Sequence, residues 1–107
     1  MIIRHATLYG TVPPEHQQSF DAHMAGPVVS AMHQYPNILK VELEKVTEQG
    51  ADTPPIYMQF NSYYATLDDM NAALASPVRD RVKALTQEGL KHFDGHMTHS
   101  VSKLVKP

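Results

Sequence analysis

The chain has 107 residues and a formal net charge of −2 at pH 7, with its lysines and arginines spread along the sequence. This length fits one domain over residues 1–107, and the lack of a basic cluster argues against nucleic-acid binding. Cysteine is absent, which excludes a disulfide framework, and no apolar run approaches the roughly 20 residues of a membrane helix. We therefore expect a cytoplasmic protein that binds neither nucleic acids nor membranes.

The first half of the chain predicts a strand, a helix and a second strand. Residues 2–9 are rich in β-formers and precede Gly10, so they predict a strand. Pro13-Pro14 opens a helix that runs to about residue 34 and bends at Gly26-Pro27. Residues 38–46 alternate in polarity, as a half-buried strand does. The alternation of the first strand puts one set of side chains on one face (Ile3, His5, Thr7, Tyr9) and a second set on the other (Ile2, Arg4, Ala6, Leu8).

The second half predicts another strand, a split helix and a final strand. Residues 56–64 form the third strand, with one face made by Ile56, Met58, Phe60, Ser62 and Tyr64. Thr66 caps a helix that stops at Ser76-Pro77, with Leu67 among its inward positions. Ser76 then caps a new helix that ends near Gly89 or Gly95, and residues 96–105 are the last strand.

This order of elements, β-α-β-β-α-β, predicts a ferredoxin-like α+β fold: a four-stranded antiparallel sheet with helices on one face. The other face would carry Leu8, Tyr57 and Tyr63, which is too apolar to leave in water. We therefore expect a two-fold homodimer that pairs sheet to sheet, with Gln59 and Asn61 satisfied near the seam.

His23 lies among the apolar positions of the first helix. Phe20, Met24, Val28 and Tyr35 belong to this stripe, so the imidazole should point into the domain. An inward imidazole needs a hydrogen-bond partner, and that partner sets its proton affinity. It is either a satisfied packing residue or part of a pocket.

The chain resembles the EthD-like branch of the dimeric α/β-barrel proteins over nearly its whole length. The residues that carry the resemblance are Leu8-Tyr9, Phe20 with His23, Tyr35-Pro36-Asn37-Ile38, Pro54-Pro55-Ile56 and, most specifically, the run from Ala65 to Pro77. Where family members often have His-x-Pro-Leu in the first helix, this chain has Ala25-Gly26-Pro27-Val28, so a second helix histidine is missing. The resemblance implies a homodimer with a cofactor-free pocket between sheet and helices for small apolar or aromatic compounds.

The preferred site joins the first strand to the first helix. If the His5 face of the strand meets the helix, His5 and His23 converge beside Tyr9 and Phe20. One neutral imidazole would then abstract a proton, and a phenol from Tyr9 or Tyr64 would donate to the developing oxyanion. The catalytic candidates are His5, His23 and Tyr64, and the candidates for substrate binding are Thr7, Tyr9, Phe20, Met58, Phe60 and Ser62.

Three classes of function remain open. The leading one is a cofactor-independent enzyme of hydrophobic or aromatic metabolite breakdown, of the isomerase, cyclase or monooxygenase type. The second is a non-catalytic binding or accessory protein with the same pocket, and the third is a haem-binding barrel with His23 or His96 as axial ligand. We expect no metal site at His92, His96 and His99, because strand alternation sends the last two to opposite faces.

Overall fold

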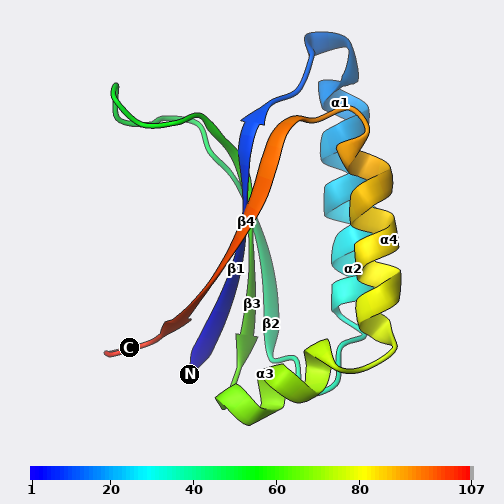
Figure 1. Ribbon diagram of the computed structural model, residues 1–107, viewed down its shortest axis with the longest axis vertical. Coiled ribbons are helices and arrows are strands. Elements are labelled where there is room, and N and C mark those ends of the chain that lie inside the picture. The colour runs from blue at the N-terminus through cyan, green and yellow to red at the C-terminus, as the bar shows by residue number, and fades with distance from the viewer. Residues whose placement is uncertain (107) are drawn as a thin grey trace.

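A computed structural model describes residues 1–106. Within these residues the strands form one four-stranded antiparallel sheet in the order β2-β3-β1-β4, and Figure 1 shows the helices packed against one of its faces. The expected ferredoxin-like α+β fold is thereby confirmed. The elements are β1 (Ile2–Thr11), α1 (Pro14–His23), the π-helix η1 (Met24–Val28), α2 (Val29–Met32), β2 (Lys40–Lys45), β3 (Ile56–Tyr64), α3 (Leu67–Leu74), α4 (Val78–Leu90) and β4 (Asp94–Lys103). None of the helices in the described part of the chain has both the length and the hydropathy needed to cross a membrane.

The first helix bends where the sequence predicts it. The turn between α1 and α2 is the π-helix η1, which contains Gly26 and Pro27. Proline has no N–H to donate to the preceding turn, and a π-helical turn absorbs this missing hydrogen bond without ending the helix. The α1–η1–α2 segment and α4 lie side by side over the sheet (Figure 1), and the segment ends at Met32.

The second helical region is split as expected, but only the first of its two predicted caps forms. The Thr66 hydroxyl accepts a hydrogen bond from the backbone N–H of Asp69 at 3.1 Å and so begins α3. Ser76 does not cap α4, because its hydroxyl donates to the Ala73 carbonyl at 2.6 Å and closes the end of α3 instead. Leu67 is 51% exposed, so its predicted inward position is wrong.

The face of β1 that carries Arg4, Ala6 and Leu8 packs against the helices. In the register, Ala6 pairs with Phe60 and Leu8 pairs with Met58, and all four side chains are buried. Leu8 therefore belongs to the core, and its predicted place on the bare face is wrong. The central position of β1 makes both of its faces partly apolar, so its alternation alone does not say which face meets the helices.

Tyr57 also leaves the face that the alternation assigns to it. The register shifts between Leu8 and Tyr9, which marks a bulge at this end of the β1–β3 pair. The Tyr57 ring packs edge-on against Phe20 at 5.5 Å between centroids, and its hydroxyl donates to Asp21 Oδ1 at 2.6 Å. Tyr63 stays on the outer face, where its hydroxyl donates to Glu42 at 2.5 Å.

Candidate functional site

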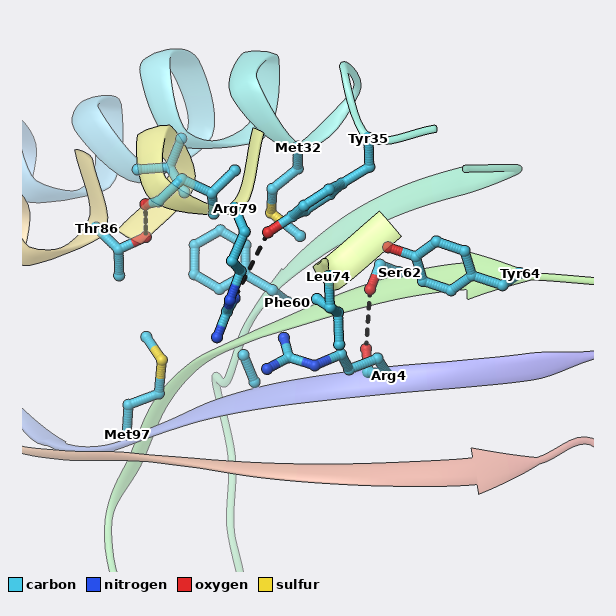
Figure 2. A pocket seen from close by; sticks show the side chains of 13 residues that line it. Arg4, Met32, Tyr35, Phe60, Ser62, Tyr64, Leu74, Arg79, Thr86 and Met97 are labelled. Carbon is cyan, nitrogen blue, oxygen red and sulfur yellow. Dashed lines mark hydrogen bonds between the residues drawn. The ribbon is translucent and has the colours of Figure 1, made fainter. Parts of the chain in front are cut away.

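One cavity lies between the sheet and the helices, and Figure 2 shows its lining side chains. The space between them is about 380 Å³ when its open mouth is included, of which about 30 Å³ admits the centre of a water molecule. That inner space is enough for about two waters, since one water needs roughly 10–15 Å³ on this measure. The apolar walls come from β1, β3, β4 and the helices: Ala6, Val28, Met32, Phe60, Leu74, Val82 and Met97.

Two arginines from opposite layers enter this cavity. Arg4 comes from β1 and Arg79 from the first turn of α4, and both guanidinium groups extend into the space between sheet and helices (Figure 2). In residues 1–106 the ion pairs are Lys40–Glu42 and Lys45–Asp21, so neither arginine has a carboxylate partner there. Burial lowers the pKa of Arg4, and the like charge of Arg79 lowers it further.

Two tyrosines complete the polar part of the lining. The hydroxyl of Tyr35 accepts a long hydrogen bond of 3.5 Å from Arg79 Nη1. Tyr64 is fully buried, and its hydroxyl has no hydrogen-bond partner in the described structure. Burial raises the pKa of Tyr64, although the nearby Ser62 hydroxyl works against this; Ser62 itself donates to the Arg4 carbonyl at 3.5 Å. A neutral phenol with a free donor therefore borders the cavity.

His99 lies on the side of β4 that faces this cavity. It pairs with Ala6 in the sheet and follows Met97 by two residues, and both of those residues line the cavity. Partial burial lowers the pKa of His99, and the positive charges of Arg4, Arg79 and Lys83 lower it further. Both effects favour the neutral imidazole, the form that can accept a proton, although the His99 side chain is exposed.

The residues predicted for the site separate into several places. Phe60, Ser62 and Tyr64 line the cavity, because alternate positions of β3 face the helices. Met58 lies on the same side of β3 but is packed in the core and does not reach the cavity lining.

His5 and Thr7 lie on the face of the sheet that carries no helices. His5 Nδ1 is 2.7 Å from Asn61 Oδ1 and its Nε2 is 3.0 Å from Ser102 Oγ, while Thr7 donates to Gln59 at 2.8 Å. Asn61 in turn donates to Glu44 at 2.6 Å. His5 thus belongs to a polar network on the outer face of the sheet.

His23 and Phe20 lie at the helical layer. His23 Nε2 is 2.7 Å from the Leu85 carbonyl of α4, which fixes the ring between the two helices and identifies Nε2 as the donor. Both residues border an open groove with His92 and Glu88, separate from the cavity. The predicted convergence of His5 with His23 is wrong, because the sheet separates them.

Tyr9 is not in the cavity lining either. Its ring stacks on His96 of the neighbouring strand with 5.5 Å between centroids. In the part of the chain that the structure describes, no three His, Asp or Glu side chains are grouped closely enough to hold a metal ion.

Sequence reasoning missed Arg4, Arg79 and His99 as site residues. Arg4 shares a strand face with Ala6 and Leu8, and Arg79 lies one turn before the inward-facing Val82. Both positions can be read from the sequence, but they indicate a site only once the face of β1 that meets the helices is known.

Comparison with solved structures confirms the fold, and the matched structures include one from the EthD family that the sequence resembles. An ethyl tert-butyl ether (EthD) family protein from Bacillus halodurans C-125 superposes with a TM-score of 0.71 at 18% identity, covering 98% of this chain and 100% of that one. A dimeric protein of unknown function and ferredoxin-like fold from Bacteroides fragilis NCTC 9343 gives 0.68 at 15% identity, covering 96% of each chain. A cofactor-independent oxygenase from Streptomyces nogalater gives 0.61 at 15% identity, covering 99% of this chain and 94% of that one. No protein-family model and no curated protein sequence matches significantly.

Proposed function

We propose that this protein is a small cofactor-independent enzyme that acts on a hydrophobic or aromatic metabolite in the cavity between its sheet and helices. The observation that carries the proposal is the free hydroxyl of Tyr64, fully buried and in one mostly apolar cavity with two arginines that have no carboxylate partner in residues 1–106. Unsatisfied buried polar groups cost free energy, so their retention indicates a use in function. The oxygenase from Streptomyces nogalater with the same fold supports this class.

Isomerases, cyclases and cofactor-independent oxygenases can share one first step. A C–H bond next to a carbonyl breaks, the proton passes to a base, and the electron pair moves onto the carbonyl oxygen as an enolate. An enzyme accelerates this step by placing hydrogen-bond donors and positive charge where the negative oxygen develops. Tyr64, Arg4 and Arg79 supply that combination.

The base of such a reaction must come from outside the cavity lining. The cavity lining contains no histidine, aspartate or glutamate, so we assign this role to His99, which lies on the cavity-facing side of β4. The same observation favours a second function, a binding protein that holds the same ligands without turning them over. Proton abstraction separates the two functions.

Deuterium exchange at an activated carbon tests both functions, the enzyme and the binding protein. We would incubate the protein with anthrone in deuterated buffer and follow loss of the methylene proton signal by NMR. The enzyme is expected to accelerate exchange, and Tyr64→Phe is expected to reduce that acceleration at least tenfold. Binding of anthrone without faster exchange would favour the binding protein, and neither binding nor exchange would contradict both.

The proposed roles of His5 and His23 are tested in the same assay. If His23 is the catalytic base, as the sequence predicts, His23→Phe abolishes turnover while the protein stays folded. Since His23 lies outside the cavity, unchanged exchange in this variant would remove it from the mechanism. His5→Gln tests His5, on the outer face of the sheet, in the same way: unchanged exchange would remove it from the mechanism.

We further propose that the protein is a homodimer that pairs the outer faces of two sheets. That face carries the hydrogen-bonded network of His5, Thr7, Gln59 and Asn61, and Asn61 is only 5% exposed. No helix covers this face in the described structure (Figure 1). The protein from Bacteroides fragilis that shares the fold is dimeric, which supports this arrangement.

A further inference from the structure

The charge inside the cavity is unbalanced. Arg4 and Arg79 line one small space from opposite layers, and the two ion pairs of residues 1–106 both lie elsewhere. Asp80 follows Arg79 directly but is exposed and lies in neither of those pairs. Two partly buried cations beside each other cost free energy unless an anion joins them.

The hydrogen-bonding groups around the arginines are arranged to donate. The Tyr64 hydroxyl is fully buried without a partner, and the Tyr35 hydroxyl can donate because it already accepts from Arg79. Guanidinium groups bind carboxylates through paired N–H···O bonds, and a phenol donates readily to the same oxygens. The lining contains no carboxylate that would repel an anion or neutralise the arginines from within.

The inner space also matches a carboxylate in size. It holds about two water molecules, which is close to the volume of a carboxylate group. The rest of a ligand would lie against the apolar side chains of the lining, among them Met32, Phe60 and Leu74. Methionine side chains adapt to such a ligand with little cost.

We propose that Arg4 and Arg79 bind the carboxylate of an aromatic or hydrophobic acid, while the Tyr64 hydroxyl stays free to donate to the enolate oxygen of the proposed reaction. This assignment rests on the proposed function and names its substrate class. Arg79 is the specificity-determining residue, because it brings a positive charge from α4 into the lining, where its Nη1 donates to the Tyr35 hydroxyl. A neutral aromatic ligand would leave both cations uncompensated until an enolate forms on it.

The test compares benzoate with benzamide, which has nearly the same shape but no charge. Binding of each to the full chain would be measured by NMR titration at constant ionic strength. Benzoate is expected to bind at least tenfold more tightly than benzamide, with the largest shifts at residues that line the cavity. Arg79→Gln and Arg4→Gln are expected to remove this preference, whereas Arg81→Gln is the control, because Arg81 is exposed on the same helix.

Equal binding of benzoate and benzamide would overturn the assignment, as would a preference that persists in Arg79→Gln. If Arg4→Gln fails to fold, Arg79→Gln alone decides. Anthrone exchange that continues while benzoate shows no advantage would contradict only the carboxylate assignment. Benzoate selectivity without any exchange would instead contradict the catalytic proposal and leave the carboxylate site in place.

Discussion

Tyr64 combines a structural cost with a proposed role. Its hydroxyl is buried without a partner, whereas the ring packs in the core. Removing an unsatisfied buried hydroxyl relieves a desolvation penalty, which is about 1 kcal/mol or more. We therefore expect Tyr64→Phe to raise the free energy of unfolding by about 1 kcal/mol while it removes most of the exchange activity.

Urea unfolding followed by circular dichroism measures the stability of this variant. Ser62→Ala is the matched control on the same strand face, because it removes a hydroxyl that has an acceptor at 3.5 Å. A destabilised Tyr64→Phe would show that the hydroxyl has a partner, and the argument for a free donor would then fail.

The lowered pKa of His99 predicts a pH dependence of stability. Burial and the charges of Arg4, Arg79 and Lys83 keep its folded-state pKa below the ordinary value of 6.5. As the pH falls through 6.5, the unfolded chain takes up the proton more readily than the folded chain, so the free energy of unfolding decreases. Above that pH the ring is neutral in both states and contributes no such change.

Urea unfolding at pH 7.5, 6.5 and 5.5, chosen to bracket the ordinary pKa of His99, compares the protein with His99→Gln. The variant is expected to lose less stability than the parent as the pH falls, because the penalised protonation is gone. Parallel pH curves for the two proteins would contradict this account, and they would also weaken the proposal of His99 as the base.

The contact between the first helix and α4 depends on Gly89. A Cβ at this buried position would lie 2.6 Å from Met24 Cε and 2.8 Å from His23 Cδ2. The methionine end can move, but the His23 ring is held by the Leu85 carbonyl. Gly89→Ala should therefore lose about 1–2 kcal/mol of stability, since overpacking outweighs the gain in helix propensity.

Gly26→Ala is the control for this prediction. No atom lies within 4 Å of the added Cβ, so we expect no loss and up to about 1 kcal/mol of gain from helix propensity. Thermal unfolding measures both variants. Equal stability of the two alanine variants would contradict the packing argument at Gly89.

The elements were predictable from the sequence, but the faces of β1 were not. Breakers such as Pro13-Pro14 and Ser76-Pro77, together with period-two and helical patterns, mark the strands and helices locally. The face of β1 depends on its pairing with β3, where Ala6 meets Phe60, and this is a long-range choice. Both faces of β1 carry apolar side chains, so hydrophobicity could not decide between them.

The assignment of the β1 faces explains which of the predicted site residues line the cavity and which do not. Phe60, Ser62 and Tyr64 were placed correctly in a pocket wall because β3 has one clearly apolar face. His5 and Thr7 were placed on the wrong side, and Arg4 was overlooked, because the faces of β1 were exchanged. His23 was correctly expected to turn inward, but its partner is the Leu85 carbonyl instead of a second imidazole.

The bare face of the sheet predicts that two copies of the chain associate. Two chains of 12.0 kDa would give a species of twice that mass in light scattering after size exclusion. Gln59→Arg places a charge at the centre of the outer face, opposite Thr7, and should shift the protein to the monomer mass. Arg81→Glu, on exposed helix α4, should leave the mass unchanged.

A parent protein that elutes at the mass of one chain would contradict the dimer. The cavity itself lies within one chain, so the carboxylate assignment would not depend on this result. Loss of folding in Gln59→Arg would be recognised by circular dichroism, and Thr7→Arg then provides the second charge on the same face.

The two ends of the described chain meet along the β1–β4 edge, where the N–H of Leu104 donates to the Met1 carbonyl at 2.9 Å. A short peptide bridge could therefore join these ends without rearranging any strand. New ends could open in the exposed segment at residues 47–55, which projects away from the helices in Figure 1. We therefore expect the fold to tolerate a cyclic reordering of its sequence that leaves the arginine pair and Tyr64 in place.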